Sequence, residues 1–257
     1  ASGTRTYNGV LLSFQRRSAD GVSVNTNYTL SKCEGHPTQD LPNIGTGWSK
    51  PEDPDFDRGA CDADRRHVLN MTVGVQTPDL GDGLAAALGE GWRVSGILRA
   101  ISGAPLTVST GQDRALNGVT NGTTSNQRGN LVRDNPYGDK TPGNWLNPAA
   151  FEQPALGTFG NTRRGQFRGP TRWWVDMVLA RMFRVGAGQQ VELRAEAFNV
   201  LNNVRWGNPV IDLSNRNFGR ILPQGAGALA SGGTPDRATQ LGADDPRILQ
   251  FAVKYQF

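Results

Sequence analysis

Residues 246–257 read PRILQFAVKYQF, and apolar and polar side chains alternate along them from residue 249 to the end. A period of two residues is typical of a β-strand whose two faces meet different surroundings. One face would carry Leu249, Phe251, Val253, Tyr255 and Phe257. The opposite face would carry Gln250, Ala252, Lys254 and Gln256. The pattern predicts an amphipathic strand, either in a soluble β-domain or in a membrane-embedded sheet.

Further segments of the chain alternate in the same way. They span residues 6–17, 21–32, 67–77, 92–102, 173–184 and 190–201, and an extension of the fourth segment through residues 105–108 is left open. The first two segments read as a β-hairpin, because only residues 18–20 separate them. A short helix is expected within residues 83–89. The sequence therefore predicts an all-β fold of about seven antiparallel strands.

The segment 173–184 has the dimensions of a membrane-crossing strand. Its apolar face consists of Trp173, Val175, Met177, Leu179 and Phe183, and Arg181 interrupts this face near its end, from where it is expected to reach toward the interface. From the first to the last of these residues, steps of roughly 3.3 Å tilted by about 40° span roughly 25 Å, the height of the apolar band of an outer-membrane β-barrel. An aromatic residue stands at each end. We predict that this row and the terminal row face lipid and form the aromatic girdle.

Charged and amide side chains occupy the alternate positions of the same strands. Such side chains are costly against lipid but suit a polar barrel interior. The residues predicted to face the lumen are Asp176, Glu192, Arg194, Glu196, Gln250 and Lys254.

Long and short connections alternate between the predicted strands. The long ones are residues 33–65, 103–171 and 202–245, and the short ones are 18–20, 78–91 and 185–188. A transmembrane barrel sorts its connections in this way, with short periplasmic turns and long extracellular loops, whereas sandwiches and jelly rolls do not. The region 109–171 is rich in Gly, Asn, Pro and Arg and is expected to be irregular. The long loops are expected to bind cargo.

Composition excludes several classes of protein. The 257 residues are 37% hydrophobic with a mean hydropathy of -0.48, and no run approaches the roughly 18 apolar residues that a membrane helix needs. The N-terminal ASGTRTYNG lacks the features of a signal peptide, so we expect that a leader has been removed or that the chain is the tail of a longer one. The net charge of +4 comes from scattered arginines matched by 23 acidic residues, so no nucleic-acid partner is expected.

No catalytic constellation stands out. With two histidines, the chain offers little material for acid–base chemistry, and no Ser-His-Asp set, phosphate-binding loop or metalloprotease motif is recognisable. We therefore expect that the protein is not an enzyme and that it has no cofactor.

The cysteines, Cys33 and Cys61, flank a long polar loop. A disulfide between them would close the base of that loop in an oxidising compartment. The alternatives are free thiols and a zinc site in which His36 and His67 complete the ligand set.

Two loop clusters suggest ligands. Asp53, Asp55 and Asp57, with Asp64 further along, faintly resemble a calcium loop, although the glycine is misplaced, so a solvated loop is the preferred interpretation. Basic and aromatic residues also gather around residues 163–174, and we interpret them as lipopolysaccharide or headgroup contacts beside the girdle rather than as an RNA-binding patch. They are Arg163, Arg164, Phe167, Arg168, Arg172, Trp173 and Trp174.

Several segments together resemble the C-terminal barrel of TonB-dependent outer-membrane receptors, in particular the Oar-like group with its carboxypeptidase-regulatory-like domain. They are TYNGVLLSFQRRSADGVSVNTNYTLSKC (6–33), DADRRHVLNMTVGVQTP (62–78), GWRVSGILRAISGAPLTVSTG (91–111), FGNTRRGQFRGPTRWWVDMVLARMF (159–183), VELRAEAFNVLNNVRWGNP (191–209) and DPRILQFAVKYQF (245–257). The resemblance implies a 22-stranded barrel around an N-terminal plug, driven by TonB. It also implies that the barrel-assembly machinery recognises the terminal strand through Tyr255 and Phe257.

An odd strand number would leave two unpaired edges in lipid, whereas single-chain bacterial barrels generally have even numbers. We therefore expect residues 1–257 to be the C-terminal part of one larger barrel domain, without its plug, in the bacterial outer membrane. Its partners would be lipid, lipopolysaccharide, the rest of the barrel and plug, the assembly machinery and, through the missing part, TonB. The alternative function is a β-rich surface adhesin or a soluble extracellular binding module without transport.

Overall fold

The computed structural model describes residues 3–17, 21–36, 49–50, 52–78, 80, 83–118, 127–186, 188–222 and 246–257. The predicted turn at 18–20 and parts of the three predicted cargo-binding loops (37–48, 119–126 and 223–245) lie outside these residues. Among the described residues, no helix has the length and apolar character that crossing a bilayer requires.

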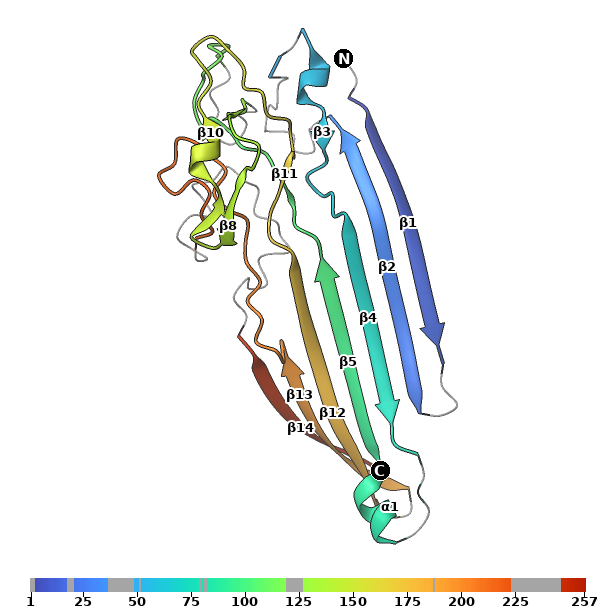
Figure 1. Cartoon of the computed structure of the whole chain (residues 1–257). Helices are drawn as coiled ribbons and strands as arrows, with labels where there is room; N and C mark the ends of the chain where they lie inside the picture. The colour runs from blue at the N-terminus through green and yellow to red at the C-terminus, as the bar shows by residue number, and fades with distance from the viewer. Residues whose placement is uncertain are drawn as a thin grey trace.

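A large antiparallel sheet dominates the fold. Its long strands are β1 (Arg5–Arg16), β2 (Val22–Gly35), β4 (His67–Gln76), β5 (Trp92–Ile101), β12 (Arg172–Gly186), β13 (Gln189–Phe198) and β14 (Ile248–Gln256). They follow one another in the order β1-β2-β4-β5-β12-β13-β14, and the short strand β3 (Gly59–Ala60) pairs with β2 (Figure 1). Each long strand corresponds to a segment that the alternation predicted, so the all-β antiparallel fold class is confirmed.

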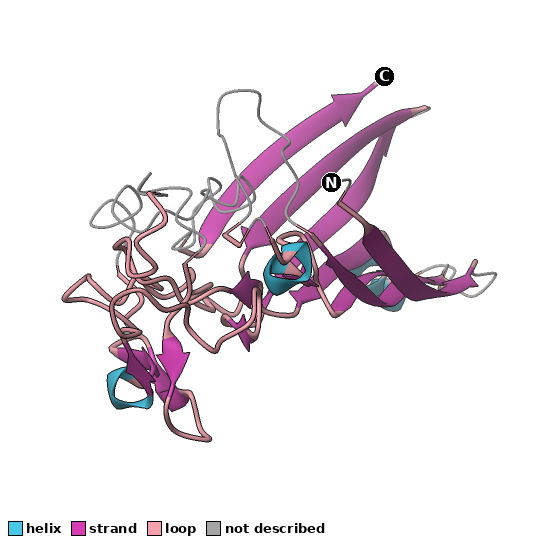
Figure 2. Ribbon diagram, turned by 90° about the horizontal axis from the view of Figure 1, so that it is seen from above, coloured by secondary structure: helices cyan, strands magenta, loops and turns pink. Residues whose placement is uncertain are grey.

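The main sheet is curved and open (Figure 2). β1 and β14 form its two edges, and in the described structure each pairs with one neighbouring strand. Every residue of both edge strands is exposed. A closed barrel would have no edges, so the described sheet is open. We call this sheet the wall.

The connections are sorted between the two ends of the sheet. The strand ends that the short connections join lie at the lower end in Figure 1, together with the C-terminus and helix α1 (Leu84–Gly89), which forms where a short helix was expected. The described parts of the long connections lie at the opposite end, near the N-terminus. The alternation of loop lengths along the chain thus becomes a division between the two ends of the wall.

The long connections form a small folded body that we call the loop platform, namely the described parts of residues 49–66, 103–171 and 203–222. Its secondary structure comprises η1 (Pro54–Asp57), β6 (Pro105–Leu106) paired with β11 (Phe167–Arg168), β7 (Asn130–Leu131) paired with β10 (Phe151–Glu152), β8 (Tyr137–Thr141) paired with β9 (Asn144–Leu146), and η2 (Pro148–Ala150). Its apolar core consists of Leu106, Val108, Leu146, Ala150, Phe151, Phe167 and Phe218. As expected, most of the described residues of 109–171 lie outside helices and strands, but they fold around a core of their own.

The possible extension of the fourth strand through 105–108 does not occur. β5 ends at Ile101, and β6 belongs to a separate small sheet. Between them Gly103 passes so close to Gly169 that a Cβ atom on it would lie 1.8 Å from the Gly169 carbonyl oxygen. The wall and the platform meet at this close backbone approach.

Candidate functional site: an amphipathic wall and its loop platform

Strand pairing brings the apolar rows of neighbouring strands onto one face of the main sheet. Leu179 of β12 lies opposite Val94 of β5 and Ala195 of β13, and Ala195 lies opposite Phe251 of β14. Directly opposed residues of an antiparallel ladder point to the same side. The same face carries Trp173, Val175, Met177, Leu179, Phe183, Leu249, Phe251, Val253 and Tyr255, all of which were predicted to face lipid. Phe257 follows the end of β14.

This apolar face continues through β5 and β4 to β2. Val94 lies opposite Val75 of β4, which lies opposite Val22 of β2. The side chains of Phe251 and Val253 keep exposed fractions of 77% and 74%. No protein layer in the described part of the chain covers them, so the face is free to meet a surrounding apolar phase.

Aromatic side chains stand in one row near the platform end of the apolar face. Tyr28 of β2 lies opposite Leu69, Leu69 lies opposite Ala100, and Ala100 lies opposite Trp173. The Tyr28 hydroxyl is 2.7 Å from Nδ1 of His67, which begins β4. A ring with one apolar body and one polar tip suits an apolar–aqueous boundary.

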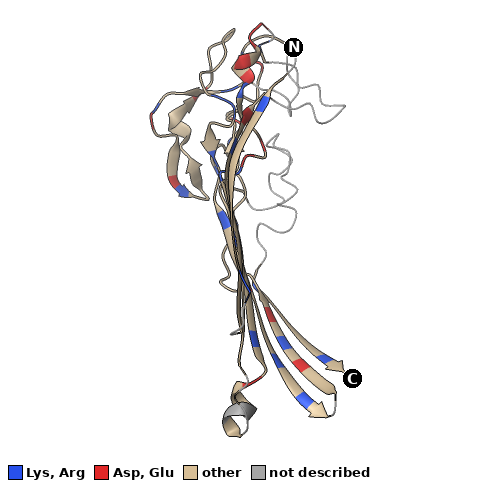
Figure 3. Cartoon of the chain, turned by 90° about the vertical axis from the view of Figure 1, so that its right-hand side faces the viewer, with Lys and Arg blue, Asp and Glu red and all other residues tan. Residues whose placement is uncertain are grey.

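The opposite face of the wall is polar. The pairing places all the residues predicted to face the lumen on it, namely Asp176, Glu192, Arg194, Glu196, Gln250 and Lys254. Glu192 lies opposite Lys254, and Arg194 Nε is 2.7 Å from Glu196 Oε1. Figure 3 shows charged residues along the lower parts of these strands. Charges of both signs thus neutralise one another along this face.

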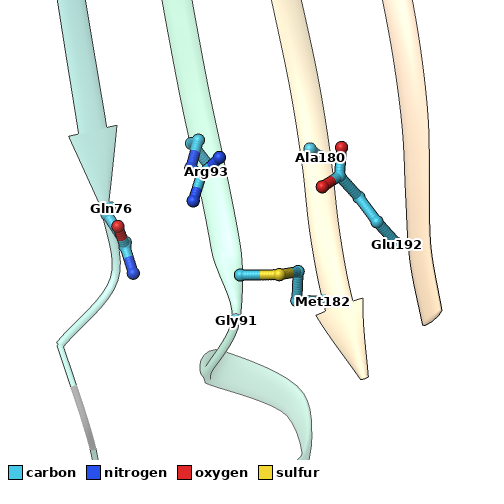
Figure 4. Close-up of a pocket in the computed structure, with 6 residues that line it drawn as sticks. All are labelled: Gln76, Gly91, Arg93, Ala180, Met182 and Glu192. Atoms are coloured by element: carbon cyan, nitrogen blue, oxygen red, sulfur yellow. The ribbon is translucent and has the colours of Figure 1, made fainter. Parts of the chain in front are cut away.

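Arg93 joins this charged group from β5 and was not singled out from the sequence. Arg93 and Glu192 lie on either side of Ala180 in a shallow pocket that Gln76, Gly91 and Met182 complete (Figure 4). Ala180 is 5% exposed because its longer neighbours cover it. The alternation of the segment 92–102 could have identified this residue, since it puts Arg93 on the polar face of the strand.

Asp176 has a structural role in addition to its place on the polar face. Its carboxylate accepts a hydrogen bond of 2.8 Å from the Asn199 backbone N–H. Asn199 directly follows β13, has a φ of 48°, and exchanges hydrogen bonds with Asn203. Asparagine tolerates this left-handed conformation better than most residues. The strand therefore ends at Phe198, earlier than the predicted residue 201.

The predicted disulfide between Cys33 and Cys61 is present, with a Cα–Cα distance of 5.4 Å. It ties the end of β2 to the platform. Cys33 belongs to the row of β2 that points to the polar side of the sheet, where it lies opposite Tyr7 of β1. The Cys61 backbone N–H donates to the Cys33 carbonyl over 3.1 Å. The alternatives of free thiols and of a zinc site using both cysteines are therefore wrong.

A buried ion pair crosses the platform. Arg128 Nη1 is 2.8 Å from Asp57 Oδ1, and the side chains are 2% and 0% exposed. Arg128 also donates to the carbonyls of Phe56 and Thr162, and it lies over the Phe56 ring. Burial lowers the pKa of Arg128, and the hydrogen bond and charge of Asp57 oppose that shift. Asp57 also accepts from the Ser49 backbone N–H and hydroxyl, so every part of the buried carboxylate is used.

The family of the chain follows from a comparison with protein-family models. The model of the outer membrane beta barrel domain matches residues 1–240. The chain belongs to this family. No curated protein and no solved structure matches the chain.

Membership in this family places the barrel domain in the outer membrane and in contact with its lipids. The open sheet agrees with this family assignment in its antiparallel pairing and its two unlike faces. The soluble extracellular binding module, which the sequence left open as an alternative, does not fit an outer-membrane location.

The histidines of the barrel domain have protein partners rather than zinc. His36 is hydrogen-bonded to Thr4 and lies 3.3 Å from Asp55, and His67 contacts the Tyr28 hydroxyl. Within the described ranges, no three His, Cys, Asp or Glu residues are arranged to hold a metal ion.

The calcium-like aspartates are dispersed. Asp57 is bound to Arg128, whereas Asp64 accepts from the Cys33 backbone N–H and pairs with Arg168 over 2.6 Å. The solvated-loop interpretation is also incorrect for these two aspartates, because both are buried inside the platform. The sequence did not reveal their arginine partners, which lie far along the chain.

The basic–aromatic cluster is split by the fold. Arg164 is buried and pairs with Asp62 over 2.7 Å, and Arg168 pairs with Asp64. Phe167 belongs to the platform core, and Trp174 lies on the polar face opposite Arg99. Trp173 alone of the cluster's aromatic residues stands on the apolar face. The headgroup interpretation is therefore wrong for Arg164, Phe167 and Arg168, and it stays a prediction for Arg163, Arg172 and Trp173.

Proposed function

We propose that this barrel domain is part of the wall of a TonB-dependent receptor of the Oar-like group, with cargo bound by the long loops and conducted along the polar face. One observation carries the proposal. A continuous apolar face and a charged face run along the same strands, and the long connections gather as a folded platform at one end. The resemblance of the six strand segments to that group supplies the finer assignment.

The apolar face meets lipid in this proposal. Burying such a face in hydrocarbon removes it from water, and the opposite orientation would place Glu192, Arg194 and Lys254 against lipid. A charged side chain at the bilayer midplane costs about 2–4 kcal/mol for Arg or Lys. With several charges on one face, the energetic preference for a polar lumen is large.

The edges β1 and β14 pair with further strands of the same barrel in this proposal. Unpaired backbone groups cannot stay in the hydrocarbon core, because no water reaches them there. The resemblance implies a 22-stranded barrel around a plug. The polar face would then meet the plug and water, and TonB would act through the plug.

The platform lies outside the cell in this arrangement, because long connections are extracellular in outer-membrane barrels. Tyr255 and Phe257 would serve as the signal for the barrel-assembly machinery at the periplasmic end. The domain would bind and conduct without catalysing a reaction.

Two experiments on the full-length protein test the proposal. Barrel character predicts heat-modifiable migration: the unheated protein in detergent runs as a compact band that shifts on boiling. TonB dependence predicts a cross-linked species with TonB when living cells are treated with formaldehyde. A protein that is not heat-modifiable contradicts the barrel, and a heat-modifiable protein that never cross-links to TonB contradicts the receptor assignment alone.

A second candidate function is surface adhesion by an outer-membrane barrel that transports nothing. The compact core of the platform favours it, because a preformed loop body is a ready binding surface. Deleting the gene of an adhesin would reduce attachment of cells without changing uptake of any nutrient, which separates the two candidates.

A further inference from the structure

Arg181 is a charged residue on the apolar face, which also carries Arg16 of β1 and Lys32 and Glu34 of β2 at its ends. In the described parts of β4, β5, β12, β13 and β14, it is the one Lys, Arg, Asp or Glu that this face carries, lying opposite Trp92 and Leu193. It stands near the end of β12 at which the short connections gather. A charge at this place must lie at the membrane boundary rather than within hydrocarbon.

Two aromatic rings hold the guanidinium of Arg181. Its central carbon lies 4.9 Å from the Trp92 ring centroid and 4.7 Å from the Phe183 ring centroid. A guanidinium that lies over aromatic rings keeps its charge and its planar set of N–H donors, a geometry that matches the oxygens of a phosphate.

Helix α1 adds apolar surface beside this arginine. The Trp92 Nε1–H donates to the Leu88 carbonyl over 2.9 Å, which fixes the end of the helix to the ring that contacts Arg181. The side chains of Leu84 and Leu88 are 78% and 63% exposed. The nearby Glu90 carboxylate accepts from the Leu80 backbone N–H within the same connection. Exposed leucines beside an arginine and a tryptophan are typical of a segment that anchors at a membrane interface.

We infer that Arg181, Trp92 and α1 form a binding site for an anionic phospholipid of the periplasmic leaflet. The lipid phosphate would accept hydrogen bonds from the Arg181 guanidinium, and the acyl chains would lie along the apolar face toward Leu179. This inference rests on the proposed orientation of the wall. It commits to a phospholipid rather than to free phosphate, because the cation is surrounded by exposed apolar side chains.

Native mass spectrometry of the full-length protein in detergent tests the site, with phosphatidylglycerol as the probe. We expect the wild type to retain phosphatidylglycerol and Arg181→Gln to retain about tenfold less, as the loss of one charge-assisted contact implies. The matched control is Arg184→Gln, since Arg184 lies close by on β12 but in the polar row opposite Gln190. The control should retain the lipid as the wild type does, and Arg181→Lys should give an intermediate loss.

Other outcomes overturn the inference. Equal retention by Arg181→Gln and the wild type does so, as does an equal loss in the Arg184 control, which would indicate unspecific charge attraction. Displacement of the lipid by inorganic phosphate would point to a free-phosphate site instead.

Heat-modifiable migration of each variant separates a lost site from a lost fold. Brominated phosphatidylglycerol gives a second readout, because it should quench fluorescence more in the wild type than in Trp92→Phe. If the wild type itself is not heat-modifiable, the proposed function fails. If the wild type is heat-modifiable and Arg181→Gln retains as much lipid as the wild type, this inference alone fails.

Discussion

Arg128 and Asp57 stand 71 residues apart in the chain, yet they form a 2.8 Å ion pair with almost no solvent contact. The pair joins the loop after β2 to the loop after β5. Two of the long connections of the wall are therefore one folded unit at this point, and the platform presents a fixed surface instead of separate loops.

Replacing Asp57 by Ala should destabilise the platform by about 3–5 kcal/mol, because the buried Arg128 guanidinium loses its counter-charge. Hydrogen exchange should accelerate in residues 49–58 and 127–132 while β12 stays protected. The control is Asp53→Ala, since the Asp53 side chain is half exposed and its ion pair with Lys50 is 3.6 Å long. Identical exchange in both variants would show that the buried pair does not hold the loops together.

Removing the disulfide by Cys33→Ser and Cys61→Ser should loosen the base of the platform. The bond closes a loop with a sequence separation of 28, for which chain entropy predicts a loss of about 3.5 kcal/mol. We expect limited proteolysis to cut within residues 52–66 in the double variant but not in the oxidised wild type. The long strands should keep their heat-modifiable migration. Cleavage of both proteins at the same rate would contradict a structural role for the bond.

Acid should release the turn that Asp113 holds. Its pKa is lowered from 3.8, chiefly by the Gln127 side-chain amide, with further hydrogen bonds from the Asn117 and Gly118 backbone N–H groups. A lowered pKa means that the stabilisation is complete above the ordinary pKa and is lost as the pH falls through the lowered one. The protection factor of the Gly118 amide, the slowing of its exchange relative to an unstructured peptide at the same pH, should therefore stay high at pH 5 and fall below about pH 3.8. Asp113→Asn should abolish this pH dependence, and its persistence in that variant would assign it to another group.

A lysine at Met177 should impair insertion into bilayers by about 2–4 kcal/mol, because it would place a charge against hydrocarbon near the midplane. The adjacent Val178→Lys is the matched control, since Val178 lies on the polar face opposite Glu196. Urea titration of vesicle-inserted protein, followed by band migration, measures both. Equal destabilisation of the two variants would contradict the two-faced wall.

The strands of the wall were predictable because each extends over many residues and alternates throughout. The segment 173–184 was expected, and β12 spans Arg172–Gly186. The strand ending at residue 201 was predicted too long, because the Asn199 turn depends on backbone conformation and on a hydrogen bond to Asp176 that alternation does not encode.

The platform was not predictable in the same way. Its strands, such as β6 and β11, are too short to show a period, and they form because distant segments share one core. The partners Arg128 and Arg168 likewise could not be assigned to Asp57 and Asp64, since sequence spacing carries no information about contacts between separate loops. The disulfide was the exception, because two cysteines offered one pairing.

Spin labels at adjacent positions of β13 test the central claim most directly. Leu193 and Arg194 lie side by side in the strand, the first on the apolar face and the second on the polar face. In the full-length protein in bilayers, a nitroxide at residue 193 should be relaxed mainly by oxygen, which concentrates in hydrocarbon. A nitroxide at residue 194 should be relaxed mainly by a water-soluble nickel complex. Equal accessibility at the two positions, or the reverse order, would contradict a wall with lipid on one side and a polar conduit on the other.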